Sequence, residues 1–156
     1  SCHNTFGQSR KWGVWNAYNR QPIIMRMGDA TASWAYSTNT IRQSNGAAGN
    51  TVAAFCGLAE EPIAVGFGQV VVYTGGAASG ANIGVGVDST TVISGRRGRS
   101  ANATINFTPP PLTATHVITS LLGLSNINAL ETGNGTATTT FQGAQDDMML
   151  TAAWRA

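Results

Sequence analysis

Apolar and polar residues alternate in short runs along most of this chain, with the two-residue period of a β-strand. The clearest run is WAYSTNTIR, in which Trp34, Tyr36 and Thr38 share one face. Helical periodicity is weak throughout, so the pattern predicts roughly eight or nine short strands at the spacing of a β-sandwich. They are expected at 22–27, 34–42, 51–58, 63–73, 83–93, 101–107 and 113–122, with two more in 136–156.

The segment 136–156, TATTTFQGAQDDMMLTAAWRA, finishes on a strand pattern of its own. A threonine-rich strand runs into a polar turn at Gly143 to Asp147, and a second apolar strand follows as far as Trp154 and Arg155. We predict that these two strands form a hairpin and that the final strand belongs to the core sheet.

Segments rich in glycine, asparagine, serine or proline separate the predicted strands. Asn45-Gly46 is a turn signal, and Pro109 to Pro111 predict an extended crossing because proline cannot join a central ladder. The predicted loops are 43–50, 74–82, 94–100 and 123–135. The polar residues 1–11 are predicted to form an N-terminal arm or linker, and residues 12–156 one β-sandwich domain.

The composition limits the classes of protein and of partner that fit this sandwich. Only 10% of the 156 residues are charged, against roughly 25% in an average soluble domain. Such a surface suits close-packed assemblies and secreted or virion proteins. The net charge of +2 gives no electrostatic case for a nucleic-acid partner, and no apolar run approaches the roughly 20 residues of a membrane span.

The two cysteines, Cys2 and Cys56, lack the CxxC spacing of zinc or thioredoxin-like sites. A disulfide between them and two separate thiols remain equally open, although the apolar run around Cys56 favours a core position.

The acidic and histidine residues do not form a recognisable catalytic or metal-binding pattern. Glu60-Glu61 and Asp146-Asp147 are predicted to be solvated turn charges, because neighbouring strand residues point to opposite faces and no further acid completes a calcium loop. His116 lies within a strand pattern, and no GxSxG elbow exists. We therefore predict no enzymatic activity, no cofactor and no metal.

The segment SGRRGRS carries the one concentrated charge of the chain, at Arg96, Arg97 and Arg99. It lacks the lysine and spacing of a phosphate-binding loop. Guanidinium groups here suit an acidic host polysaccharide, a phosphate-bearing glycan or an acidic patch on a neighbouring protein. A solvated loop without a partner is the alternative interpretation, and both stay open.

The aromatic residues divide between core and interface. Trp34 and Trp154 have strand spacing and are predicted to lie in the core. The candidates for a subunit interface stand close to the predicted arm: Trp12, Trp15, Tyr18 and Arg20.

Several segments give the chain a resemblance to tailed-bacteriophage virion proteins. These are WNAYNRQPI, the W-x-Y strand at Trp34 and Tyr36, the segment TIRQSNGAAGN, and the final strand ending in Trp154-Arg155. The resemblance implies a jelly-roll module in the virion, commonly a homotrimer. It implies a capsid decoration, a head fibre or a tail-fibre head, with major capsid or fibre proteins as partners.

Two other functions are alternatives to this structural role. A receptor-binding module would recognise host surface polysaccharide through loops 94–100 and 43–50. A capsule depolymerase would need two carboxylates roughly 5 to 10 Å apart, whereas the acids of this chain are scattered over its predicted turns.

Overall fold

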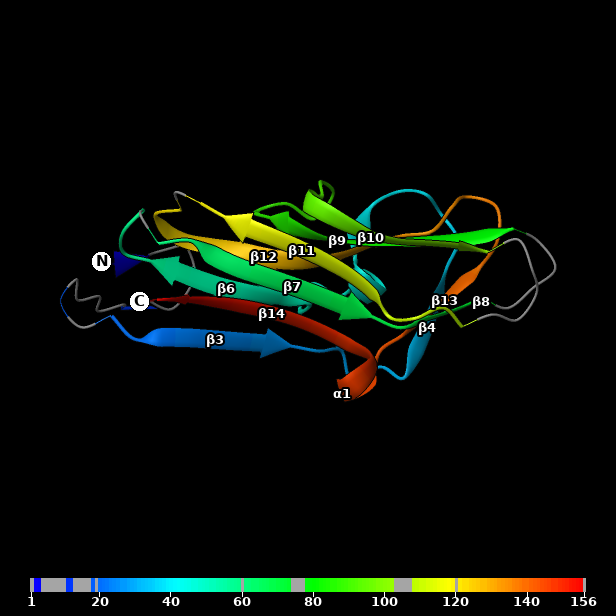
Figure 1. Ribbon diagram of the computed structural model, residues 1–156, viewed down its shortest axis with the longest axis horizontal. Helices are drawn as coiled ribbons and strands as arrows, with labels where there is room; N and C mark the ends of the chain where they lie inside the picture. Colours follow the sequence, from blue (N-terminus) through cyan, green and yellow to red (C-terminus); the bar gives the residue numbers. More distant parts are fainter. Residues whose placement is uncertain are drawn as a thin grey trace.

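The computed structural model describes residues 2–3, 11–12, 18, 20–59, 61–73, 78–102, 108–119 and 121–155, and these form an elongated, almost entirely β structure (Figure 1). The first strands are β1 (Cys2–His3), β2 (Lys11–Trp12), β3 (Pro22–Met27), β4 (Ser33–Tyr36), β5 (Arg42–Gln43), β6 (Thr51–Cys56), β7 (Ile63–Gln69) and β8 (Val71–Tyr73). The others are β9 (Ser79–Val87), β10 (Ser94–Asn102), β11 (Leu112–Ile118), β12 (Gly123–Thr132), β13 (Thr139–Gln142) and β14 (Met148–Arg155). Two short helical turns are η1 (Ser44–Gly46) and α1 (Ala144–Asp147).

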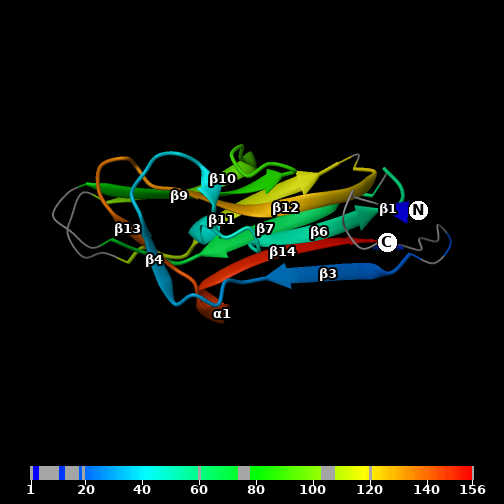
Figure 2. The same ribbon diagram turned by 180° about the vertical axis from the view of Figure 1, so that it is seen from behind.

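Eight of these strands form two antiparallel layers that pack face to face (Figures 1 and 2). One layer has the order β3-β14-β7-β11, and the other has the order β10-β9-β12-β6. Along the chain, the strands pass from layer to layer in the order that defines an eight-strand jelly roll. A single pairing of Arg96 with Thr115 joins β10 to β11, so the sheet is continuous around that edge. The predicted all-β, jelly-roll-like sandwich is confirmed.

The core lies between the two layers and follows from strict alternation along the strands. In β7, the residues Ile63, Val65 and Phe67 are buried, and the residues between them face outward. Cys56 and Trp154 are also buried in this core, as predicted.

A third sheet covers one end of the sandwich and is called here the capping sheet. Its strands, in the order β4-β13-β8, come from three different connections between the layers. Trp34 of β4 stacks on Phe141 of β13 with ring centroids 6.4 Å apart, and Trp34 is half-buried against the core. β1 and the C-terminal end of β14 lie at the opposite end, the terminal end (Figure 1).

The predicted terminal hairpin is wrong, although β14 does lie inside the main sheet, between β3 and β7. β13 pairs with β4 and β8 in the capping sheet instead. The Gly143 N–H donates to the Ala32 carbonyl, which ties the turn to the β3–β4 connection. The predicted single strand 63–73 is divided for a related reason, because the Val70 N–H donates to the Asp147 carbonyl where β7 ends.

The predicted loops 94–100 and 123–135 are also wrong, because they contain the long strands β10 and β12. Their polar residues hide the period-two pattern. Asn128 of β12, for example, is buried but accepts a hydrogen bond from Gln43 and donates one to the Ser89 carbonyl. Two further predicted strands differ from the structure. The strand predicted at 83–93 is β9, which begins at Ser79 and ends at Val87, and the strand predicted at 34–42 is divided into β4 and β5.

Several other predictions concern segments that lie partly or wholly outside the described residues. Of the predicted arm, β1 and β2 pair antiparallel, while 4–10 lies outside the description. Trp15 and the strand expected beyond Asn102 also lie outside it. Residues 88–93 form a turn, so β9 ends short of the predicted strand 83–93; the Ser89 hydroxyl accepts from the Thr91 and Val92 N–H groups there.

Candidate functional site: the arginine groove

The three arginines of SGRRGRS stand on β10, the strand at which one layer of the jelly roll meets the other. Gly98, between them, is buried, and a Cβ at this position would lie 2.7 Å from the Thr113 carbonyl oxygen and 2.9 Å from Ile83 Cγ1. The absence of a side chain at Gly98 therefore lets the backbone of β10 pack directly between Thr113 and Ile83. The arginines thus belong to the scaffold of the sheet.

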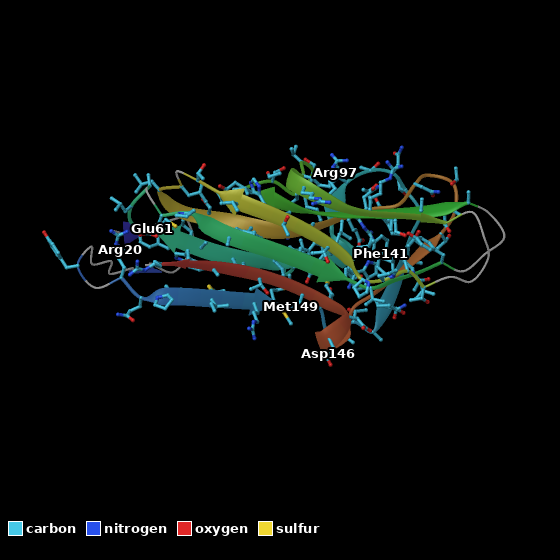
Figure 3. The ribbon with its side chains drawn as sticks, viewed as in Figure 1. Arg20, Glu61, Arg97, Phe141, Asp146 and Met149 are labelled. Atoms are coloured by element: carbon cyan, nitrogen blue, oxygen red, sulfur yellow. The ribbon has the colours of Figure 1, made fainter. Side chains whose placement is uncertain are left out.

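Two hollows adjoin along β10 and share Arg97 and Arg99. The β9 hollow has a volume of about 580 Å³, and the β11 hollow has a volume of about 670 Å³. The β9 hollow is lined by Asn39, Asn82, Arg97, Arg99, Thr132 and Asn134, among others. The β11 hollow is lined by Arg96, Arg97, Arg99, Pro109, Pro111 and Thr115, among others. Together they are called the arginine groove; Arg97, which is labelled in Figure 3, lines both hollows.

The groove carries positive charge without a compensating acid. Arg96, Arg97 and Arg99 are exposed, and no aspartate or glutamate lines either hollow. Within the described part of the chain, the ion pairs lie elsewhere, between Arg20 and Glu61 and between Arg42 and Glu131. The neighbouring segments 74–77 and 103–107 contain no acidic residue either.

This arrangement favours an anionic ligand that also carries hydroxyl groups. A guanidinium presents a planar fork of N–H donors that matches a carboxylate or a phosphate. Arg97 and Arg99 are two residues apart on a strand, so their Cα atoms are separated by about 7 Å. The asparagine and threonine side chains of the β9 hollow both donate and accept hydrogen bonds, as recognition of hydroxyl groups requires.

A buried carboxylate holds one wall of the β9 hollow in place. Glu131 is fully buried, and its Oε1 accepts from Arg42 Nη2 at 2.7 Å and Arg42 Nε at 2.9 Å. Its Oε2 accepts from Trp34 Nε1 at 2.8 Å. Burial raises the pKa of Glu131, and the hydrogen bonds from Trp34 and Arg42 oppose that rise. The carboxylate therefore joins β12 to both β4 and β5.

The wall itself is the segment between β4 and β5, which contains Asn39. The Gly133 N–H donates to the Thr38 carbonyl at 2.8 Å, and the Gly135 N–H donates to the Ser37 carbonyl at 2.7 Å. In Figure 2, this segment and the one that follows β12 run side by side above the capping sheet. The Arg42 guanidinium also lies 3.7 Å from the centre of the Tyr36 ring, a cation–π contact that fixes the base of the wall.

A second buried carboxylate, Asp29, continues this polar network. It accepts hydrogen bonds from the Thr31 N–H and from the side-chain amides of Asn45 and Asn50. Burial by itself would raise the pKa of Asp29, but these hydrogen bonds outweigh it and the pKa is lowered. Asn45 has φ of 58°, and its own N–H donates to Glu131, so the predicted Asn45-Gly46 turn bridges the two carboxylates.

The predicted interface residues do not gather into one described site. Tyr18 is fully exposed, and Arg20 forms an ion pair with Glu61 at the terminal end (Figure 3). Trp12 contributes its backbone to β2, and Trp15 lies outside the described residues.

Sequence reasoning singled out the arginines but missed the residues that surround them. The pattern predicted a loop at Glu131 and did not indicate that Asn39, Thr132 and Asn134 lie beside the arginines. The alternation of Ile127, Ala129 and Glu131 was the available signal for a strand whose inner face ends in a carboxylate.

The remaining candidate chemistry stays dispersed. In the described ranges, no three His, Cys, Asp or Glu side chains lie together as metal ligands would, and no described helix is long and apolar enough to cross a membrane. Cys56 has a free thiol, so it is not paired with Cys2. No protein-family model matches the chain, and no curated protein is significantly similar to it.

Proposed function

We propose that this chain forms a surface domain of a tailed-bacteriophage particle, where it decorates or stabilises the capsid or forms a fibre head. Jelly rolls build viral capsid domains, but also lectins and cupins, so the fold supports this role by analogy only. The segments WNAYNR and IRQSNG supply the likeness to virion proteins. The low charge of the chain suits close packing in an assembly.

The observation that carries the proposal is the outer face of the layer β3-β14-β7-β11, called here the weakly charged face. Its charged side chains are Arg26 of β3 and Arg155 at the end of β14. The other outward residues are Pro22, Ile24, Ala64, Gly66, Gly68, Thr113, Thr115, Val117, Met149, Thr151 and Ala153. Ile24 and Val117 are each 61% exposed. A second copy of the chain would cover this apolar surface, in the homotrimer expected for such modules.

Gly66 offers a direct test of that packing. A Cβ at Gly66 would meet no atom within 4 Å in the single chain, so Gly66→Glu leaves the fold intact. We expect the wild-type chain to have a light-scattering mass of about 49 kDa, three times 16.2 kDa, and Gly66→Glu to be monomeric.

The matched control is Ala53→Glu, which places the same charge at an exposed position of β6 in the other layer and should keep the trimer. A monomeric wild-type chain would contradict the self-association. Immunogold labelling of purified phage particles tests the location separately. Absence of the chain from the particles would contradict the proposed function.

Recognition of host surface polysaccharide is the second candidate function. It is favoured by the exposed arginines of the groove, which have no acidic partner within the described residues. Because the two functions use different surfaces, one particle protein could perform both.

A further inference from the structure

We propose that the arginine groove binds an anionic polysaccharide, which lies across β10 with its acidic groups on Arg97 and Arg99. This inference deepens the second candidate function and rests on it for its biological setting. The binding itself is argued from the groove alone.

The first step is the charge of the groove. Three exposed guanidinium groups stand within four residues of one strand, and no described acid faces them. Like charges held this close repel each other in the free protein. An anionic ligand relieves that repulsion, so the cluster favours the bound state.

The second step is the size of the groove and the groups that line it. A single small ion would not fill hollows of about 580 and 670 Å³, which are in the range of pockets for larger ligands. Asn39 and Asn82 bring side-chain amides to the β9 hollow. Asn134 and Thr132 shape its wall, because the Asn134 amide donates to the Ala78 carbonyl and the Thr132 hydroxyl donates to the Gly133 carbonyl. Such amide groups match the many hydroxyls of a sugar chain.

The third step separates a polysaccharide from other polyanions. β10 pairs with β9 on one side and is joined to β11 by the Arg96–Thr115 pairing on the other. Only its stretch beyond that pairing, beside Pro109 to Pro111, lies open to an added peptide strand, and the titration with poly-L-glutamate tests this alternative. A membrane surface is recognised by clusters of four to eight basic residues, and the groove has three. With a net charge of +2, the chain lacks the extended basic surface of a nucleic-acid-binding protein.

The fourth step is preorganisation. The backbone at Gly98, between Arg97 and Arg99, is packed against Thr113 and Ile83. The Glu131–Arg42 ion pair holds the segment that carries Asn39. A ligand therefore meets a groove whose walls need little ordering, which reduces the entropic cost of binding.

The test is a calorimetric titration of the full chain with carboxylated polysaccharides, namely polygalacturonate, alginate, hyaluronate and polysialate. Poly(glycerol phosphate) distinguishes a phosphate from a carboxylate as the acidic group. Methyl-esterified polygalacturonate is the neutral match, and poly-L-glutamate, short duplex DNA and anionic lipid vesicles are the competing polyanions.

We expect at least one anionic polysaccharide to bind, with affinity falling roughly tenfold or more in Arg97→Ala/Arg99→Ala. Arg97→Lys/Arg99→Lys should recover only part of that loss, because lysine keeps the charge but loses the planar fork. Arg155→Ala is the control: it removes an exposed guanidinium at the C-terminal end of β14, away from the groove, and should bind normally.

Three results would overturn the inference: no binding to any anionic polysaccharide, equal loss in Arg97→Ala/Arg99→Ala and in Arg155→Ala, or equal or tighter binding of poly-L-glutamate, DNA or vesicles. Groove-dependent binding by a chain that is absent from phage particles would uphold the inference and defeat the proposed function. If the chain is present on particles but its binding does not depend on the groove, the inference fails and the proposed function stands.

Discussion

At the scale of single residues, Glu131 is the side chain on which we expect the stability of this structure to depend most. It is a fully buried carboxylate in a chain with few charges, and each oxygen accepts hydrogen bonds from groups on other segments. Removing one partner of a buried pair is costly because the other charge is left uncompensated. Arg42 keeps partial access to solvent, which moderates that cost.

We therefore expect Glu131→Gln to lower the free energy of unfolding by about 3 kcal/mol. The new amide N–H₂ would face the N–H donors that now point at a carboxylate oxygen. Urea unfolding followed by circular dichroism measures the change. Asp146→Asn, at an exposed position of α1, should stay within about 0.5 kcal/mol of wild type; equal stability of both variants would mean that the buried pair contributes nothing.

Asp29 makes a prediction about pH. Its folded pKa lies below the ordinary value of 3.8, so the unfolded chain binds more protons as the pH falls through this range. The stabilisation from its ionised form is complete above pH 3.8 and is lost as the pH falls through the folded pKa. The difference in unfolding free energy between wild type and Asp29→Asn should therefore be constant near neutral pH and shrink below pH 3.8. A difference that grew with acidification would contradict the lowered pKa.

At the scale of elements, the connection between β9 and β10 shows how the outer surface of a strand becomes buried. A Cβ on Gly86 would meet the Ser89 carbonyl oxygen and lie 2.7 Å from Leu130 Cδ1. The turn 88–93 thus folds back over β9 and β12, and only glycine leaves room for it.

We expect Gly86→Ala to cost about 2 kcal/mol of unfolding free energy, because an added methyl must displace backbone. Gly49→Ala is the control, since a Cβ there would meet no atom within 4 Å, and it should be neutral or slightly stabilising. Urea midpoints of the two variants provide the comparison, and equal midpoints would show that the turn yields easily.

The same scale shows what sequence patterns can and cannot predict. Period-two alternation located β3, β6 and β11 well, because each has one apolar face. It could not predict that β13 and β14 belong to different sheets, since the pairing depends on strands distant in the chain. The pattern predicted a loop in place of β12, whose buried polar residues are satisfied by other segments, and in place of β10, whose arginines are exposed.

The candidate site was predictable in the same partial way. Charge density pointed to Arg96, Arg97 and Arg99, but the hollows beside them are completed by four connections, β4–β5, β8–β9, β10–β11 and β12–β13. Asn39 and Asn134 enter the site only because backbone hydrogen bonds bring their segments together. No local pattern contains that information.

At the scale of the whole molecule, the capping sheet is tied to the jelly roll. Trp34 of the capping sheet donates a hydrogen bond to Glu131 of the jelly roll, and short connections join β8 to β7 and β13 to β14. We expect one unfolding transition, with tryptophan fluorescence and far-ultraviolet circular dichroism changing together in urea. Separate midpoints for the two signals would indicate that the capping sheet opens first.

The capping sheet also restricts how this protein can change over generations. Three connections that are usually free to vary in length pair with one another here, through β4, β13 and β8. An insertion in one of them must preserve its register with the next, so changes in length are selected against in all three together. Outward side chains of β10 can be exchanged without disturbing that register. New ligand preferences should therefore arise by point substitution along this strand, in contrast to the loop-length variation by which antibodies diversify.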